Sequence, residues 1–145
     1  MRGLLLAGVL VASASAGGAE KSAPDAMRGE QVYARCLACH ALAYDRVGPR
    51  HCGLFGRRAG SVPRFSYSPA MKKSGIVWND KTLDRFLRKP LKMIPGTAMT
   101  YDGVVDAGER ADLIAYLKHA NNTPECARQA PLKPRWRCCL PTAPP

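Results

Sequence analysis

The feature that most constrains this chain is the five-residue segment Cys36-Leu37-Ala38-Cys39-His40. Its CxxCH spacing is the signature of covalent haem attachment. Two thiols add to the vinyl groups of the porphyrin, and the imidazole binds the iron. Positions i, i+3 and i+4 share one face of a helix, so all three side chains can reach the same porphyrin edge. The segment therefore predicts a small domain that folds around one haem c, attached through Cys36 and Cys39.

Three other kinds of site use a similar segment. A thioredoxin-like redox pair is disfavoured because the surrounding βαβ pattern is missing. A zinc site needs further ligands, and no second CxxC occurs. The side chains that could supply such ligands are His51, Cys52, Cys126, Cys138 and Cys139. A structural disulfide beside an incidental histidine is the third alternative.

Residues 1–19 have the pattern of a secretory signal peptide. Arg2 gives a positive start, an apolar run covers residues 4–12, and Ala14-Ser15-Ala16 precedes an expected cleavage near 16–19. The run is far shorter than the roughly 20 residues that span a bilayer, so we expect no integral membrane segment in the mature chain. Export implies an oxidising compartment, which we expect to be the periplasm of a Gram-negative bacterium.

The remaining sequence predicts one helical domain over residues 20–120 and a flexible, Pro/Arg/Cys-rich tail over 121–145. Glycines and prolines recur over 43–69 without strand-like alternation, which predicts long loops there. The first expected helix runs from a cap at Ser22 or Asp25, with Pro24 in the first turn, to about Cys39. A short helix is expected to start near Ser68, and a clearer one runs from Asn79 or Asp80 to Pro90. The last expected helix runs from the capping box Asp106-x-x-Glu109 to Asn121 and Asn122.

The net charge of +11 indicates a basic surface that attracts acidic partners. Export argues against nucleic acid as that partner, so we expect redox proteins with acidic docking surfaces. The basic side chains that we expect to form the docking ring are Lys72, Lys73, Arg88, Lys89 and Lys92.

The second axial ligand of the iron is not settled by spacing alone. Candidates in the mature chain are Met27, Met71, Met93, Met99, His51 and His119. Met27 is too near His40 in the same helical segment to reach the opposite face. Met93 and Met99 both flank the Pro95-Gly96 turn, where a loop could return a thioether to the iron, and both stay open on these grounds.

Five segments in order give the chain a family resemblance. They are GEQVYARCLACH, GPRHCGLFGRRAG, FSYSPAMKKSGIVW, TLDRFLRKPLKMIPGTAM and ERADLIAYLK. From Gly29 to Lys118 the chain resembles the class I c-type cytochromes, that is, mitochondrial-like cytochrome c and its soluble bacterial relatives. The resemblance implies an all-α class I cytochrome c fold, with three to five helices and long loops around one haem.

The resemblance also assigns roles to residues. The loop Pro95-Gly96-Thr97-Ala98-Met99 matches the family's methionine loop, which makes Met99 the second iron ligand beside His40. Pro49 matches the proline whose carbonyl holds the histidine ligand. Gly29 and Tyr33 match positions that cross the final helix at Leu113 and Tyr116. The residues assigned to cofactor binding are Cys36, Cys39, His40, Pro49, Arg57, Tyr67, Trp78, Thr97 and Met99, of which Arg57, Tyr67 and Trp78 match those that hydrogen-bond the haem propionates.

The chain departs from the family in a few places. Arg50, His51 and Cys52 stand where Asn-Leu-His is common, so an imidazole replaces a leucine. Phe86 replaces a tyrosine near the methionine sulfur, and Ala98 and Tyr101 replace a lysine and a phenylalanine. Cys52, Cys126, Cys138 and Cys139 have no family role, and three full pairings of them are possible.

The resemblance implies an electron-transport protein of a respiratory chain and not an enzyme. A protein of this family carries single electrons through a His/Met-ligated haem c, and this ligation leaves no open position on the iron. A quinol-oxidising bc complex is the expected donor, and a terminal oxidase or a photosynthetic reaction centre the expected acceptor. The alternatives are a cytochrome subunit of a periplasmic dehydrogenase, and a haem peroxidase or ligand-sensing protein with an open iron site.

Overall fold

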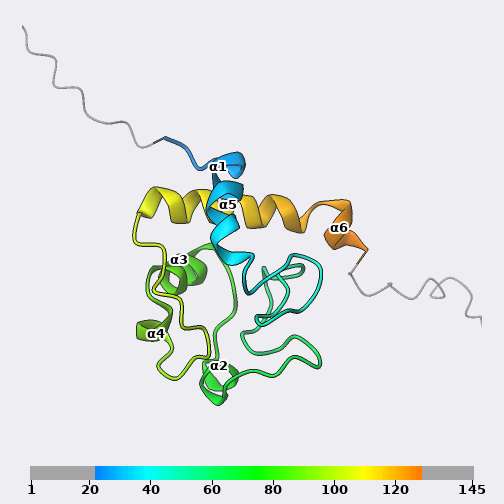
Figure 1. Cartoon of the computed structure of the whole chain (residues 1–145), viewed down its shortest axis with the longest axis vertical. Helices are drawn as coiled ribbons and strands as arrows, with labels where there is room; N and C mark the ends of the chain where they lie inside the picture. Colours follow the sequence, from blue (N-terminus) through cyan, green and yellow to red (C-terminus); the bar gives the residue numbers. More distant parts are fainter. Residues whose placement is uncertain (1–21, 129–145) are drawn as a thin grey trace, which may run out of the picture.

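A computed structural model describes residues 22–128 of the chain, and their regular structure is helical. The helices are α1 (Ala26–Tyr33), α2 (Pro69–Lys73), α3 (Asp80–Arg88), α4 (Pro90–Met93), α5 (Ala107–Asn121) and α6 (Pro124–Ala127). Within these residues the only β-type pairing is an isolated bridge between Arg58 and Val77. In Figure 1, α1 crosses α5 on one side of the molecule, and α2 and α4 lie on the opposite side. The predicted all-α class is confirmed, with α4 and α6 as short additions to the expected helices.

Side-chain caps start the helices where the sequence predicts. Asp25 accepts hydrogen bonds from the backbone N–H groups of Met27 and Arg28 at the start of α1. Ser68 caps α2 in the same way. Asn79 and Thr82 form a reciprocal capping box at the start of α3. The Asn79 side chain accepts from the backbone N–H of Thr82, and the Thr82 hydroxyl accepts from the backbone N–H of Asn79. These caps satisfy N–H groups that have no partner inside the helix.

Two local expectations differ from the structure. The α-helical part of the first helix ends at Tyr33 and continues as a 3₁₀ turn over Ala34–Cys36, and Pro24 precedes the cap. The predicted box at Asp106 is one-sided: Asp106 accepts from the backbone N–H of Glu109, whereas the Glu109 carboxylate pairs with Arg35. A charged partner on the neighbouring helix therefore takes the place of the second capping bond.

The crossing of α1 over α5 depends on Gly29. A Cβ atom at that position would lie 2.0 Å from the backbone oxygen of Asp112 and 2.7 Å from the Cβ atom of Tyr116. No side chain fits there, so only glycine allows the two backbones to approach so closely. Tyr33 packs one turn further along α1, with its ring centroid 5.0 Å from that of Tyr116. The predicted contact between these two helices is present.

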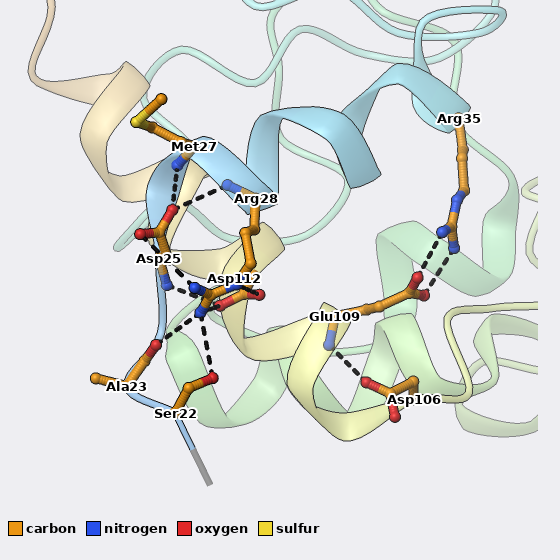
Figure 2. A network of polar contacts seen from close by, with 9 residues as sticks. All are labelled: Ser22, Ala23, Asp25, Met27, Arg28, Arg35, Asp106, Glu109 and Asp112. Atoms are coloured by element: carbon orange, nitrogen blue, oxygen red, sulfur yellow. Dashed lines mark hydrogen bonds and ion pairs between the residues drawn. The ribbon is translucent and has the colours of Figure 1, made fainter.

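Two ion pairs also join the first helical segment to α5, and Figure 2 shows both. The Arg28 guanidinium donates to both carboxylate oxygens of Asp112, at 2.8 and 3.0 Å, and the backbone N–H of Asp25 adds a third bond at 2.7 Å. Arg35 makes a two-bond pair with Glu109, at 2.7 and 2.5 Å. The crossing therefore joins the two ends of the described chain through both packing and charge.

A buried arginine ties α5 to the rest of the domain. Arg110 is only 2% exposed, and its Nε donates to Asp84 of α3 at 2.7 Å. Its Nη1 donates to the carbonyl oxygens of Val104 and Val105, at 2.9 and 2.7 Å. A buried charge is tolerated when it is paired and hydrogen-bonded in this way. Through these bonds Arg110 links α3 to the segment of Val104 and Val105, which precedes α5.

A disulfide fixes the residues that follow α5. Cys52 and Cys126 are bonded to each other, 74 residues apart in the sequence, and both are buried. Cys126 lies in α6, so the first residues of the segment predicted as a flexible tail form a helix held to the domain. This differs from the expectation because a covalent bond to Cys52 restrains them. The predicted signal peptide, the rest of the tail, Cys138 and Cys139 lie outside the described residues.

Candidate cofactor site

A cavity of about 520 Å³ lies inside the ring of helices and loops, and its lining is mostly apolar. Its volume falls within the range of sites for small molecules and cofactors. Leu54, Leu83, Phe86 and Leu113 are among its apolar walls. The structure brings all of the predicted cofactor-binding residues to this cavity: Cys36, Cys39, His40, Pro49, Arg57, Tyr67, Trp78, Thr97 and Met99.

The attachment motif forms one tight helical turn in the cavity wall. The backbone N–H of His40 donates to the carbonyl of Cys36 at 2.8 Å, and that of Cys39 donates to the same carbonyl at 3.1 Å. This turn keeps both thiols and the imidazole on the cavity side, as the spacing predicts. Cys36 is half-buried and Cys39 is exposed at the rim, and neither is in a disulfide.

The His40 ring is held by the residues that follow it. Its Nδ1 lies 2.8 Å from the carbonyl oxygen of Pro49, within hydrogen-bond distance. Gly48 packs directly on the ring, since a Cβ atom there would lie 2.3 Å from Cε1 of His40. Burial lowers the pKa of His40, while the bond to Pro49 acts in the opposite direction. The lowered pKa favours the neutral ring, which is the form in which an imidazole binds a metal.

Arg57, Tyr67 and Trp78 carry polar groups and line this mostly apolar cavity. The Arg57 guanidinium donates to the carbonyl oxygens of Cys52 and Arg50, each at 2.9 Å, which fixes its position at the cavity. Burial lowers the pKa of Arg57, and burial raises the pKa of Tyr67. A cation with nearby hydrogen-bonding side chains is the environment that buried carboxylates require. This donor set fits the propionate groups of a haem.

The loop that carries Met99 forms another part of the cavity wall. Gly96 takes a positive φ of 85°, and the backbone N–H of Thr97 then donates to the carbonyl of Ile94 at 3.0 Å. The Thr97 side chain is buried, and its hydroxyl oxygen accepts from the backbone N–H of Met99 at 3.3 Å. Met99 is partly buried against the core.

The structure separates the other candidate ligands by position. Met71 and His51 line the cavity together with Met99. Met27 is 79% exposed, Met93 packs against the core outside the cavity, and His119 is exposed on α5. Because the ring of His51 stacks on that of His40, it lies on the side of the cavity that His40 already occupies. The thioethers of Met71 and Met99 are thus the candidates that line the cavity without stacking on His40.

His51, which the sequence analysis left as one of several candidate iron ligands, lies at the cavity against His40. Its ring centroid lies 4.5 Å from that of His40, with the planes inclined by 19°. Burial, then the nearby charges of His40 and Arg57, lower the pKa of His51 well below its usual value. The replacement of leucine by histidine was the available signal, but sequence does not show where the imidazole points.

The alternative sites for the motif find no support in residues 22–128. No group of three or more His, Cys, Asp and Glu side chains in this part of the chain could hold a metal ion by itself. Cys52 and Cys126, two of the possible zinc ligands, are bonded to each other. The helical fold of the described residues lacks the βαβ unit of a thioredoxin.

Comparison with known proteins agrees with the site geometry. The family model described as Cytochrome c matches residues 26–121. Cytochrome c2 of Blastochloris viridis is 44% identical over 120 residues, which cover 81% of this chain and 93% of the relative. Cytochrome c of Gibberella zeae is 46% identical over 98 residues, which cover 65% of this chain and 92% of the relative.

A solved structure agrees as well. Cytochrome cH from Methylobacterium extorquens has a TM-score of 0.64 and 41% identity, and the match covers 66% of this chain and 98% of that one. Separately, none of the helices within residues 22–128 is both long and apolar enough to cross a membrane.

Proposed function

The chain belongs to the cytochrome c family, and we propose that it transfers single electrons through a haem c whose iron is bound by His40 and Met99. Electron transfer and covalent attachment of haem follow from the family. The two axial ligands, and the roles of Pro49, Arg57, Tyr67, Trp78 and Thr97, are our assignments. The observation that carries them is that one cavity collects all of these side chains together with Cys36 and Cys39.

Each part of the chain has a defined task in this proposal. The bound haem supplies an iron that gains and loses one electron. Pro49 orients the imidazole of His40 through the 2.8 Å contact at Nδ1, and a carbonyl partner of this kind also raises the basicity of a ligating histidine. Leu54, Leu83 and Phe86 exclude water from the cavity, and Arg57 offers a positive charge to the propionates.

We also propose that the protein is not an enzyme. With His40 and Met99 as its two side-chain ligands, a bound haem iron would have no position left for a substrate. His/Met ligation also favours a higher reduction potential than ligation by two nitrogen donors. The reading with an open iron site predicts that the reduced protein binds carbon monoxide at neutral pH, and we expect no such binding.

Absorption spectra of the oxidised and reduced holoprotein test the ligand assignment. We expect a sharp c-type α band after reduction and the weak near-infrared band of iron(III)–methionine ligation after oxidation. Met99→Ala should abolish the near-infrared band and allow carbon monoxide to bind. The matched control is Met71→Ala, which removes the other methionine that lines the cavity. Loss of the band in Met71→Ala, with retention in Met99→Ala, would overturn the assignment.

For the docking surface, we propose the basic side chains of α2, the end of α3, and α4. They are Lys72, Lys73, Arg88, Lys89 and Lys92, and all are exposed. Figure 1 places α2 and α4 on the side of the molecule away from the α1–α5 crossing. The positive electrostatic field of these side chains speeds association with an acidic redox partner, and this field weakens as salt screens it. Our proposed donor is a quinol-oxidising bc complex, and the acceptor a terminal oxidase or a photosynthetic reaction centre.

Charge reversal tests this surface. Lys72→Glu combined with Lys89→Glu should slow reduction by the bc complex at low salt and flatten the salt dependence of the rate. Arg128→Glu is the control, because it reverses an exposed charge at the end of α6, away from α2 and α4. Equal effects from the control and the double variant would rule out the proposed surface.

We further propose that the protein works in the periplasm of a Gram-negative bacterium, after its signal peptide has been removed by cleavage near residues 16–19. The signal-peptide pattern of the sequence supports this, and the Cys52–Cys126 disulfide is consistent with an oxidising compartment. N-terminal sequencing of the exported protein should give a first residue between positions 17 and 20.

A further inference from the structure

The imidazole of His51 lies against that of His40. The two ring centroids are 4.5 Å apart, and the planes are inclined by only 19°. A stacked pair of aromatic rings is favourable beyond the apolar area that it buries, so this contact favours one relative orientation of the two rings. His51 also lines the cavity itself, so this contact occurs at the cofactor site and not in the remote core.

Tyr33 contacts His51 as well. Its hydroxyl lies 3.1 Å from Nδ1 of His51, within hydrogen-bond distance, and the two rings meet edge to face with centroids 5.6 Å apart. Tyr33 is itself only 3% exposed, and it packs against Tyr116 at the α1–α5 crossing. The plane of His51 is therefore set by α1, and through α1 by α5.

The backbone of His51 is also fixed. Its N–H donates to the carbonyls of Ala41 and Leu42, at 3.1 and 3.0 Å. Its carbonyl accepts from the Asn121 side chain at 3.1 Å. The next residue is Cys52, which is bonded to Cys126. Side chain and backbone are thus both held, so the ring of His51 is a firm surface for His40.

We propose that His51 is a positioning residue that fixes the plane of the His40 imidazole, with Tyr33 as its support. The bond from Nδ1 to Pro49 directs one edge of the His40 ring, but it leaves rotation about the line that joins these atoms. A ring stacked on the face of His40 opposes that rotation. This inference rests on the proposed role of His40 as an iron ligand.

Ring orientation has a consequence that can be measured. The plane of an imidazole that binds haem iron affects which iron d orbitals it overlaps, so a change of that plane would shift the magnetic axes of the oxidised iron at an unchanged second ligand. The haem-methyl shifts in the proton NMR spectrum and the g values in electron paramagnetic resonance both report those axes. Neither depends on the rate of electron transfer.

The test compares three single variants and one double variant of the oxidised holoprotein. His51→Leu removes the stacked ring and should change the spread of the haem-methyl shifts and the g values. His51→Phe keeps a ring on His40, so it should restore most of the wild-type pattern. Tyr33→Phe removes only the hydroxyl, so it should change the shifts in the same direction by less, and should add nothing in the His51→Leu background.

The control is His119→Leu, which makes the same substitution at an exposed histidine outside the cavity and should leave the shifts unchanged. A wild-type shift pattern in His51→Leu would overturn the proposal, as would equal changes in His51→Leu and His51→Phe. If His51→Leu does not fold, a wild-type pattern in Tyr33→Phe overturns it instead. Absence of the near-infrared band from the wild-type protein would contradict Met99 ligation and leave this inference about His40 intact.

Discussion

The two parts of the cavity wall that carry the proposed iron ligands are built differently. Behind His40, residues 48–54 are held by the contact to Pro49, the Asn121 side chain, the Arg57 guanidinium and the Cys52–Cys126 disulfide. In the loop around Met99, the backbone N–H of Thr97 donates to the carbonyl of Ile94. The backbone N–H of Met99 donates to the Thr97 hydroxyl oxygen at 3.3 Å. Connections from distant elements thus reinforce the histidine side, whereas these loop bonds are local.

This difference shows how one small domain can have a firm ligand and a more mobile one. Restraints from elements far apart in sequence resist local opening, whereas a loop held by short-range bonds opens at lower cost. We therefore expect Met99 ligation to be lost at lower denaturant concentration than His40 ligation. The predictions that follow test the two sides separately, from the largest expected effect to the smallest.

The largest effect is expected for the double variant Cys52→Ala with Cys126→Ala. A disulfide that closes a long loop typically contributes about 2–4 kcal/mol to the free energy of unfolding, so this variant should lose about that much. Guanidinium chloride unfolding of the holoprotein measures the loss, and the near-infrared band in the absence of denaturant should persist because Met99 lies on the other side. An unchanged unfolding midpoint would show that the disulfide does not restrain the histidine side.

Asn121→Ala should have the next largest effect. The Asn121 amide donates to His51 and accepts from the backbone N–H groups of Gly53 and Leu54, at 2.6 and 3.2 Å. Removal leaves these partners without their bonds, which we expect to cost about 1–3 kcal/mol in unfolding experiments. Asn122→Ala is the matched control, since its described side-chain bond is an exposed contact to Lys118. Equal losses in the two variants would contradict a special role for Asn121.

Thr97→Val tests the methionine side and should have a smaller effect on global stability. It removes the hydroxyl that accepts from Met99, a bond worth about 1 kcal/mol, and keeps the side-chain shape. The denaturant concentration at which the near-infrared band disappears should fall, while the midpoint of global unfolding changes less. Thr100→Val, at an exposed position of the same loop, is the control. A fall confined to the global midpoint would contradict a local role.

Acid should weaken the α1–α5 crossing, with the smallest effect of the four. The hydrogen bonds from Arg28 lower the pKa of Asp112, and those from Arg35 lower the pKa of Glu109. Carboxylates with a lowered folded pKa stabilise the fold above their unfolded value of about 4, and this contribution is lost as the pH falls through the folded pKa.

The Tm of the holoprotein, measured from about pH 6 to about pH 3, should therefore depend less on pH in Asp112→Asn with Glu109→Gln than in wild type. Both pairs include exposed arginines, so we expect a modest difference. An identical pH dependence in the two proteins would show that the crossing does not depend on these charges.

Most of the fold could be predicted because its signals are local. Asp25, Ser68, Asn79 and Asp106 each precede a helix within a few residues, and a capping side chain acts over that distance. The short helices α4 and α6 were missed because four residues leave almost no periodic pattern. The choice of Met99 over Met93 rested on the family resemblance, and ligation remains a proposal.

The remaining features depend on distance in space. Cys52 and Cys126 are far apart in sequence, so no spacing rule could choose their pairing among the three possible ones. The sequence showed that His51 replaces a leucine, but the stacking on His40 depends on Tyr33 and Asn121, which come from other elements. The bonds of buried Arg110 to Asp84 of α3 and to Val104, before α5, likewise could not be predicted from local sequence patterns.

The order of the elements also bears on how the haem is added. Cys36, Cys39 and His40 lie early in the chain, whereas Leu113 and Leu117, which wall the same cavity, belong to α5 near its end. A chain that crosses a membrane with its N-terminus first presents the thiols before α5 has emerged. In that interval the crossing at Gly29 is not yet formed, and the thiols face no completed wall. In the export proposed above, attachment can thus precede folding, and α5 would then close the domain over a haem that is already bound.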